Sequence, residues 1–406
     1  MAEGELMADG LTATVAGGGI AGLASAVSLA QAGWRVTVLE RAPAFGEVGA
    51  GLAITGNGMA ALAAIGADEA VRAAGYQIRH AGYQDPAGRW LLRIPDTRAG
   101  LRQATTIWGI HRQRLHAALR EAAEAADGVE LVTGAEVTGV RPGTAGGELA
   151  TVTWRGGAGE HTVESGLVVA ADGVRSTVRA QLFPDARPRY TGSTSWRAVI
   201  PDTTWDDRLV EVWGPGTEFG ALRVSDTEVY WYGQFCHPEG ASFGDELAAA
   251  REHFSRWSPR IRAVVAATTA SQIMRHDVYH LPGGLPAYVR GRVVMTGDAA
   301  HAAQTTMGQG AASALEDGVC VGRMVAAPVA AGGDLAAALA AFDRARRPRC
   351  RQIARQALMI ARFGFGLGGG WRQPVRNTFL RLVPVGLAFS AGAQVMRWTP
   401  PQPGQP

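Results

Sequence analysis

The sequence predicts an α/β fold in which a Rossmann-like nucleotide-binding domain is interrupted by a mostly antiparallel β-sheet domain and followed by a C-terminal helical segment. Two glycine-rich segments far apart in the chain, residues 17–22 and 297–311, each follow an apolar strand and open a helix. Between them, residues 187–290 carry alternating strand patterns and most of the clustered aromatic residues. The nucleotide-binding elements therefore bracket an inserted sheet domain.

The first glycine-rich segment lies inside a β-α-β unit. Apolar patterning predicts a buried strand over residues 11–16, a helix of small residues over 20–32 and a second strand over 34–40. This order and length are typical of a dinucleotide-binding half-domain, and they give the glycines between strand and helix a context that an isolated motif lacks.

The turn itself reads Gly17-Gly18-Gly19-Ile20-Ala21-Gly22 and fits the pattern G-x-G-x-x-G. In that pattern Gly17 permits the tight turn, Gly19 lets a pyrophosphate approach the backbone, and Gly22 lets the helix pack on the strand. The second strand ends at Glu40, where an acid that binds an unphosphorylated adenosine ribose is expected. The alternative is a tight turn without a ligand.

The second segment has the residues to bind the other end of a long cofactor. Asp298 follows a buried strand over residues 292–296 and can hydrogen-bond a polyol such as a ribityl chain. Gly308, Gly310 and Ala311 open a helix whose N-terminal N–H groups can face a flavin ring. Together the two segments predict FAD. His301 could serve as a base, but a structural role is favoured.

A third element, Asp172-Gly173, follows the apolar strand over residues 167–171. Asp172 is interpreted either as a helix N-cap or as a cofactor ligand. Arg175 and Arg179 lie four residues apart and are predicted to share a helix face, which is either solvated or in contact with a dinucleotide phosphate.

Composition excludes several functions. The 406 residues carry a net charge of +3, which gives no reason to expect nucleic acid as a partner. No lysine occurs, so Schiff-base and P-loop lysine chemistry are excluded. Three scattered cysteines without metal-ligand spacing predict neither a metal site nor a disulfide framework. Without a signal sequence or a long apolar run, a cytoplasmic protein that does not insert into a membrane is expected.

These motifs, in this order and spacing, resemble those of the single-component FAD-dependent aromatic hydroxylases, the group A flavoprotein monooxygenases. The resemblance covers nearly the whole chain. Besides the segments above, it rests on Glu40-Arg41, Gly49-Ala50-Gly51-Leu52, Arg112 with Leu115, Ala171-Asp172-Gly173 with Ser176 and Arg179, and Leu315-Glu316-Asp317.

The resemblance implies a GR2-type FAD-binding domain and a role for each matching residue. Glu40 would bind the adenosine ribose, Arg41 and Arg112 would lie along the ADP part and pyrophosphate, and Asp298 would bind the ribityl region. The segment from Gly308 to Ala311 would hold the isoalloxazine, and Asp172 would serve both FAD and NAD(P)H. Gly51 and Val137 are further expected cofactor contacts.

The implied activity is hydroxylation or epoxidation of an aromatic or polycyclic specialised metabolite. In such enzymes NADPH or NADH reduces the flavin, O2 adds to give a flavin hydroperoxide, and one oxygen atom passes to the substrate. The protein is expected to be a monomer or a homodimer. It departs from the family pattern in Ala303-Gln304-Thr305-Thr306 and Gly56, where prolines are usual.

For the substrate site, strand alternation places Tyr230, Tyr232 and Gln234 on one face of a strand, and Trp231, Gly233 and Phe235 on the other. We hypothesise that Arg197 and Tyr232 position substrate. The alternative is an arginine in a salt bridge and a tyrosine in the core.

Two other functions remain open from the sequence. One is a relative that binds a ligand without oxygenating it, suggested by the missing proline. The other is a membrane-associated hydroxylase of a lipid-like substrate, suggested by the apolar, arginine-bearing residues 357–398, which otherwise form a helix pair covering the core.

The expected boundaries assign residues 8–75, 106–186 and 291–345 to the FAD-binding domain. The substrate-binding domain takes residues 76–105 and 187–290, the C-terminal helices take 346–399, and a disordered tail takes 400–406.

Overall fold

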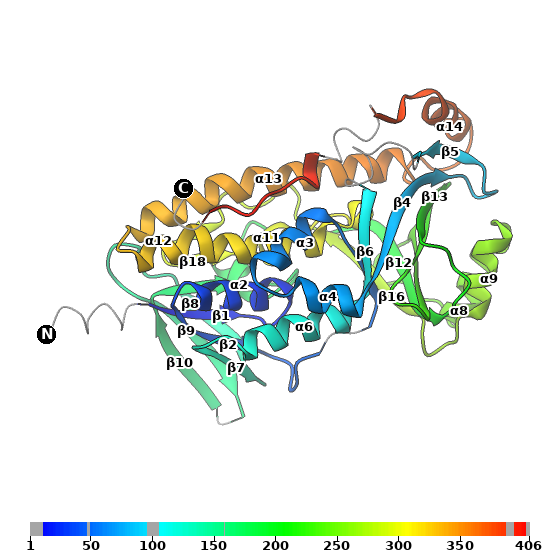
Figure 1. Cartoon of the computed structure of the whole chain (residues 1–406). Coiled ribbons are helices and arrows are strands. Elements are labelled where there is room, and N and C mark those ends of the chain that lie inside the picture. Colours follow the sequence, from blue (N-terminus) through cyan, green and yellow to red (C-terminus); the bar gives the residue numbers. More distant parts are fainter. Residues whose placement is uncertain (1–10, 47–48, 96–104, 158, 387–393, 403–406) are drawn as a thin grey trace, which may run out of the picture.

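The computed structural model describes residues 11–46, 49–95, 105–157, 159–386 and 394–402 (Figure 1). Its first sheet has the strand order β17-β18-β11-β1-β2-β7. These strands are β17 (Val289–Arg290), β18 (Val293–Met295), β11 (Leu167–Ala170), β1 (Thr12–Ala16), β2 (Arg35–Glu40) and β7 (Val129–Thr133). All pair in parallel except β17 with β18. The predicted β-α-β unit is confirmed, with α2 (Ile20–Gln31) as its helix.

The order of this sheet brings distant motifs together. β11 and β18 lie on one side of β1, and their carboxyl ends carry Asp172 and Asp298. Because parallel strands end at one edge, the first glycine turn, Asp172 and Asp298 share the crevice outside that edge.

A small antiparallel sheet lies beside this domain (Figure 1). It has the order β10-β9-β8 and consists of β8 (Glu136–Arg141), β9 (Ala150–Gly156) and β10 (Gly159–Ser165). The short helix α7 (Thr177–Leu182) packs against β8.

The inserted domain is built on a nine-stranded sheet with the order β16-β12-β15-β14-β13-β4-β6-β3, to which β5 adds at β4. Its strands are β3 (Gly51–Ile54), β4 (Tyr76–Gln84), β5 (Trp90–Arg93), β6 (Thr106–His111), β12 (Arg189–Pro201), β13 (Arg208–Gly214), β14 (Thr217–Arg223), β15 (Glu228–Cys236) and β16 (Met274–His280). Only β4 and β13 pair in parallel, so the predicted antiparallel character is confirmed. The sheet also includes β3 and β6, whose residues were expected to belong to the FAD-binding domain.

The two faces of this sheet differ as the alternation in β15 predicts. Trp231 and Phe235 pack with Trp196 and Phe254 in a core covered by α8 (Glu246–His253) and α9 (Pro259–Ala267). Tyr230 belongs to a different cluster on the opposite face. We call the face with Tyr230, Tyr232 and Gln234 the inner face.

The remaining helices cover the nucleotide-binding sheet and extend from it. They are α3 (Gly56–Ala64), α4 (Asp68–Ala74), α6 (Arg112–Glu124), α10 (Asp298–His301), the 3-10 turn η1 (Thr305–Met307), α11 (Gln309–Cys320), the π-helical η2 (Val321–Ala326), α12 (Ala327–Ala330), α13 (Leu335–Phe363) and α14 (Arg372–Leu382). Helix α13 runs along the molecule, and α14 lies at one end beside β5 (Figure 1). No helix among the described residues is long and apolar enough to cross a bilayer.

The C-terminal tail and the cysteines differ in how far they follow the sequence predictions. Pro401, inside the segment expected to be disordered, accepts a hydrogen bond from Arg323 Nη1 (3.1 Å), so this part of the tail lies on η2. Residues 403–406, 96–104 and 8–10 of the predicted segments lie outside the described residues. Cys236, Cys320 and Cys350 are all free thiols.

Close packing of α2 against α11 and η2 depends on two glycines one turn apart. A Cβ on Gly318 would lie 2.7 Å from Ala24 Cβ, and one on Gly322 would lie 1.9 Å from Ser28 Oγ and 2.4 Å from the Ser28 carbonyl oxygen. The backbones therefore approach at a distance that no side chain permits.

We expect Gly322→Ala to lower the free energy of unfolding by about 1–3 kcal/mol, because the added methyl overpacks this helix contact. Denaturant unfolding of the variant measures it. Gly146→Ala is the control, since a Cβ there meets no atom within 4 Å. Equal stability of the two variants would show that the helices separate at no cost.

Candidate active site

The first glycine turn leaves one side open. Gly17 has φ +101°, and a Cβ there would lie 2.6 Å from the Ala171 carbonyl oxygen. A Cβ on Gly22 would lie 1.9 Å from the Gly17 carbonyl oxygen, so both positions require glycine for packing. A Cβ on Gly19 meets no atom within 4 Å. Protein packing does not explain Gly19, whereas a phosphate lying against the turn does.

Glu40 is positioned by the same turn. Its Oε2 accepts from the Gly18 N–H (2.8 Å) and its Oε1 from the Ala42 N–H (2.9 Å). The ring of His116, on α6, lies 2.8 Å through Nε2 from the Gly18 carbonyl oxygen. A cavity of about 440 Å³ opens beside it, lined by Phe45, Gly46, Gln113, His116, Ala117 and Arg120. This end of the crevice has the space and polarity for a nucleoside, and Arg41 is exposed next to it.

Asp172 has a carboxylate oxygen that no described residue satisfies. Its Oδ2 accepts from the Val178 N–H (3.1 Å), while Oδ1 is buried without a hydrogen-bond partner in the described structure. Burial raises the pKa of Asp172, although hydrogen bonds from Ser176 and nearby N–H groups oppose the increase. The N-cap of α7 is Ser176, whose Oγ accepts from the Arg179 N–H (2.8 Å). Asp172 is therefore not the N-cap of α7, and its free oxygen can accept a hydrogen bond from a ligand.

The predicted pairing of Arg175 with Arg179 on one helix face is wrong. Helix α7 begins at Thr177, so Arg175 precedes it and lies exposed over the Tyr279 ring at 5.9 Å. Arg179 is buried and donates to the carbonyl oxygens of Val174 (2.5 Å), Ala186 (3.2 Å) and Ala299 (3.1 Å). It fixes the segment around Asp298.

At the second glycine segment, the residues expected to touch a flavin are open. Asp298 is exposed at the first position of α10. Gly308 and Gly310 are exposed before and within the first turn of α11, and a Cβ on Gly310 would meet no atom within 4 Å. The first N–H groups of α11 have no partner within the helix itself, which suits an electron-rich ring edge.

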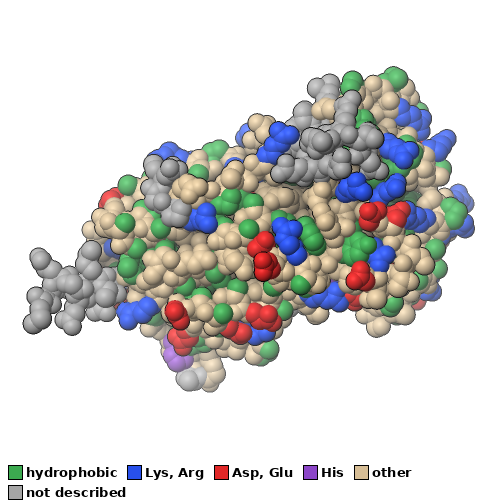
Figure 2. Space-filling view, viewed as in Figure 1, with side chains coloured by type: hydrophobic (Ala, Val, Ile, Leu, Met, Phe, Trp, Pro, Cys, Tyr) green, Lys and Arg blue, Asp and Glu red, His purple; other side chains and the backbone are tan. Residues whose placement is uncertain are grey.

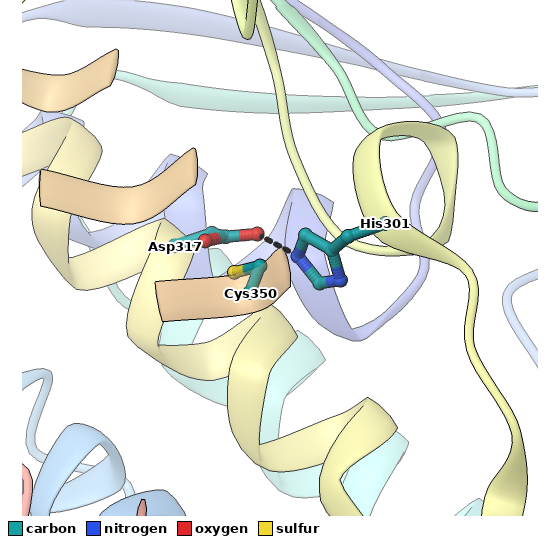
Figure 3. A group of neighbouring side chains, drawn as sticks. All are labelled: His301, Asp317 and Cys350. Carbon is teal, nitrogen blue, oxygen red and sulfur yellow. Dashed lines mark hydrogen bonds and ion pairs between the residues drawn. The ribbon is translucent and has the colours of Figure 1, made fainter. Parts of the chain in front are cut away.

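A buried charge network lies directly beneath this segment (Figure 3). Asp317 Oδ2 accepts from the Gly297 N–H (2.8 Å) and lies 2.6 Å from His301 Nε2. Arg346 Nε, from α13, donates to Asp317 Oδ1 (2.7 Å). His301, Asp317 and Cys350 bring their polar atoms within 4.8 Å of one another. Asp317 accepts hydrogen bonds from both Arg346 and the Gly297 N–H, so it is part of a fixed buried network. His301 is paired with this same carboxylate, which indicates a structural role for His301.

The network continues to α3 through Glu316. Arg346 and Arg349 both donate to its carboxylate, the latter through two bonds of 2.7 Å. Asn57 Nδ2 donates to Glu316 Oε1 (2.6 Å) and to Gln309 Oε1 (2.9 Å). The start of α11 is thereby tied to both α3 and α13.

Both titratable partners of the His301 pair are strongly shifted. Burial would raise the pKa of Asp317, but the charges of His301 and Arg346 lower it to about 2. Burial would lower the pKa of His301, but the neighbouring Cys350 and Asp317 raise it well above its usual value. Asp317 is therefore charged at neutral pH, and its charge favours the protonated form of His301.

The inner face of the nine-stranded sheet carries a row of side chains across six strands. In register across β16, β12, β15, β14, β13 and β4 stand Met274, Arg197, Tyr232, Gly220, Glu211 and Tyr83. A Cβ on Gly220 would lie 2.5 Å from the Tyr232 hydroxyl oxygen. The glycine lets the tyrosine lean across β14, where its O–H donates to Glu211 Oε1 (3.2 Å).

Glu211 belongs to a buried group of acids. His80 Nε2 lies 3.1 Å from Glu211 Oε2, and Glu218 is buried beside it. Burial, and then the Glu211 charge, raise the pKa of Glu218 well above its usual value, so Glu218 is the neutral member. Burial, and then Glu211, also raise the pKa of Tyr232 and of Tyr83.

The inner face contacts the nucleotide-binding part on both sides of Tyr232. Tyr230 lies against Gly51, where a Cβ would be 2.2 Å from its ring. Gln234 Nε2 donates to Gln304 Oε1 (3.1 Å), and Thr305 Oγ1 donates to Gln234 Oε1 (2.7 Å). The segment that departs from the family's proline is thus held to the sheet by polar side chains, and Tyr232 stands over the region between Gly51 and Thr305.

Comparison with known proteins agrees with this geometry. A sequence profile described as an FAD binding domain matches residues 11–357. Aurachin C monooxygenase/isomerase of Stigmatella aurantiaca is 36% identical over 88% of this chain and 91% of its own length. The chain belongs to the family of FAD-dependent aromatic monooxygenases.

Two further relatives support the assignment. The 2-heptyl-3-hydroxy-4(1H)-quinolone synthase of Pseudomonas aeruginosa strain UCBPP-PA14 is 31% identical to the enzyme over 92% of this chain and 94% of its own length. The structure of Klebsiella pneumoniae HpxO with FAD and uric acid shares the fold, with a TM-score of 0.81, 23% identity, and coverage of 95% of this chain and 96% of the other.

FAD is the cofactor of the enzyme, and the residues present fit it. The open Gly19, the free Asp172 oxygen and the exposed Asp298 follow the carboxyl ends of β1, β11 and β18 at one edge of the parallel sheet. Arg112 begins α6, and its charge, with that of Arg197, acts on Tyr230 and His276, which places it near the inner face. Val137 is buried in the core of the first domain, so a contact with FAD would use its backbone.

Sequence reasoning missed the two buried polar groups, around Asp317 and around Glu211. The second had a visible signal, because Glu211 interrupts the otherwise apolar strand pattern from Leu209 to Trp213. The group around Asp317 had no sequence signal except the Glu316-Asp317 pair in an otherwise apolar helix. Its partner Arg346 is distant in the sequence.

We expect Gly19→Leu to weaken FAD binding by about tenfold or more, about 1.4 kcal/mol, because the new side chain fills the space open to the pyrophosphate. Titration of the apoprotein with FAD measures this. The apoprotein should keep its stability, since nothing in the protein occupies that space, and Gly146→Leu should bind FAD normally. Unchanged affinity would place the pyrophosphate elsewhere.

We expect Asp317→Asn to lower the free energy of unfolding at neutral pH by about 2–3 kcal/mol. The Asp317 pKa is lower in the native state than in the unfolded chain. Its contribution is therefore complete above the unfolded value, about 4, and disappears as the pH falls through the native value. Unfolding curves across this range test it. Asp68→Asn, at a surface pair with Arg72, should change stability by less than about 0.5 kcal/mol at every pH.

Proposed function

We propose that the enzyme hydroxylates the ring of a bicyclic, nitrogen-containing aromatic substrate of the 4(1H)-quinolone type that carries an apolar chain. The observation that supports this most is the Tyr232–Glu211 hydrogen bond over Gly220, beside the neutral Glu218, on the sheet face turned to the FAD-binding part. The name of the 2-heptyl-3-hydroxy-4(1H)-quinolone synthase relative points to the same class.

The reaction consumes one NAD(P)H, one O2 and one proton, and yields the hydroxylated ring, NAD(P)+ and water. FAD supplies the redox chemistry and delivers the oxygen atom. The side chains of the inner face bind and orient the ring and hold its exchangeable proton. A quinolone offers an N–H and a carbonyl oxygen, and its ring carbon becomes more electron-rich when the N–H is drawn toward a base.

The acid pair matches these two groups. Glu211 can accept a hydrogen bond from the ring N–H, in addition to its contacts with Tyr232 and His80. Glu218 stays protonated and can donate to a carbonyl oxygen. Arg197, directly opposite Tyr232 in the register and on its side away from Glu211, is a positioning residue. A simple phenol has only one polar group and would use half of this arrangement.

The experiment measures oxidation of NADH and of NADPH by the yellow holoenzyme with a 2-alkyl-4(1H)-quinolone or a hydroxybenzoate, with mass spectrometry of each mixture. A quinolone that accelerates oxidation and gains one oxygen atom supports the proposal. Turnover of the hydroxybenzoate alone would overturn the substrate class. Oxidation without any oxygen gain on either compound would support a relative that binds without oxygenating.

Variants test the role of the acids. We expect Glu211→Gln to reduce kcat/KM for the substrate by about tenfold or more and to increase peroxide release, because the ring is no longer held. Wild-type activity should fall as the pH rises through the raised Glu218 pKa, and Glu218→Gln should remove that fall. Glu252→Gln, on α8 behind the other face, is the control. Unchanged coupling in Glu211→Gln, Tyr232→Phe and Arg197→Ala would reject the assignment.

A further inference from the structure

The outer side of α14 carries a continuous apolar stripe. Trp371, Val375, Phe379 and Leu382 have exposed fractions of 73%, 59%, 55% and 77%. Their spacing of four, four and three residues places them on one face of the helix. Large apolar side chains this exposed, and aligned over the whole length of a helix, mark a contact surface.

The stripe extends onto the end of α13. Met359 and Phe363 lie one turn apart there with exposed fractions of 62% and 37%. The rings of Phe363 and Phe379 meet edge to face with centroids 5.9 Å apart. The two helices therefore present one surface, which we call the α13–α14 patch: Met359, Phe363, Trp371, Val375, Phe379 and Leu382.

The opposite side of α14 is firmly docked, so the patch cannot turn inward. Arg376 is buried and donates to the carbonyl oxygens of Gly364 and Trp213. Leu380 packs with Leu91 and Trp213 beneath it. The inner side of α14 is held by the hydrogen bonds of Arg376 and the packing of Leu380, while the apolar stripe on its outer side remains exposed.

In the part of the sequence that carries the patch, all the charged residues are positive. After Asp343, the remaining 63 residues contain eleven arginines and no aspartate or glutamate. Arg355, Arg362, Arg372 and Arg381 are exposed on the same two helices. Of these, only Arg381 has an acidic partner among the described residues, Asp85 at 3.7 Å. In Figure 2 this end of the molecule shows blue and green side chains, with red ones only below it.

We propose that the α13–α14 patch docks on the surface of an anionic lipid bilayer. An exposed Trp, Phe and Leu stripe bordered by arginines fits the boundary between acyl chains and negative headgroups. A second copy of the chain fits less well, because a two-fold contact through this surface would bring the arginines of both copies together without acids to pair them.

Docking here would place the substrate end of the inserted sheet next to the bilayer. Trp213, which packs under α14, touches Tyr83 with ring centroids 4.1 Å apart, and Tyr83 ends the row that contains Tyr232 and Glu211. An alkyl-bearing substrate dissolved in the bilayer would then meet the enzyme at this end. That consequence rests on the proposed function, whereas the docking itself does not.

The test is sedimentation of the full-length holoenzyme with phosphatidylcholine vesicles prepared with and without phosphatidylglycerol. We expect binding that requires phosphatidylglycerol and weakens at high salt. The combined variant Trp371→Ser, Phe379→Ser and Leu382→Ser should reduce the partition coefficient by about tenfold or more while keeping FAD bound. Arg362→Gln with Arg372→Gln should remove the preference for phosphatidylglycerol.

The matched control is Leu149→Ser with Val163→Ser, which removes two exposed apolar side chains far from α14, with exposed fractions of 39% and 36%. It should bind vesicles like the wild type. Equal binding of the control and the α14 variant, or no binding to either vesicle, would overturn the proposal. Light scattering that shows a wild-type dimer and a monomeric α14 variant would assign the patch to contact between copies instead. If the α14 variant still hydroxylates a water-dispersed substrate, loss of vesicle binding is independent of the proposed function. Loss of hydroxylation in the wild type as well would instead contradict the proposed function.

Discussion

The ion pairs of Arg346 with Glu316 and Asp317 are the interaction on which the rest of the site depends. They connect three segments that the sequence keeps far apart: α13, α11 and the turn at Gly297. Burying a guanidinium costs several kcal/mol of folding free energy unless its charge is matched. Here two carboxylates, the Ser313 carbonyl oxygen and the Cys350 thiol surround the Arg346 guanidinium. Because Asp317 also accepts from the Gly297 N–H and lies 2.6 Å from His301 Nε2, the position of the turn at Gly297 depends on the packing of α13.

A second constraint sets the substrate side. The inserted sheet uses one face for an aromatic core and the other for polar chemistry, and glycine at Gly220 lets Tyr232 reach Glu211 across a strand. The acids are buried close together, so one of them keeps its proton and the pair offers both a donor and an acceptor. Gln234, Gln304 and Thr305 then join this face to the flavin segment through hydrogen bonds, in the region where the family pattern has proline.

Much of the fold could be predicted because it depends on local patterns. The β-α-β unit and the alternation in β15 both follow from periodicity and turn residues, and the structure confirms them. Arg175 and Arg179 could not be placed, because the helix begins at Thr177, so that it includes Arg179 but not Arg175. The buried networks were hidden as well, since the partners of Glu316 and Glu211 come from distant strands and helices.

By itself, the sequence determined the family, the cofactor and the order of the elements, because glycine spacing and apolar strands have few alternative structures. Only the tertiary structure decided which charged groups lie in the interior and which remain outside. Eleven arginines follow Asp343 in the chain, yet Arg346 is buried in ion pairs with Glu316 and Asp317, while Arg362 and Arg372 stay in solvent beside an apolar stripe. That difference arises from long-range packing, which fixes burial and partners for side chains that look identical in the sequence.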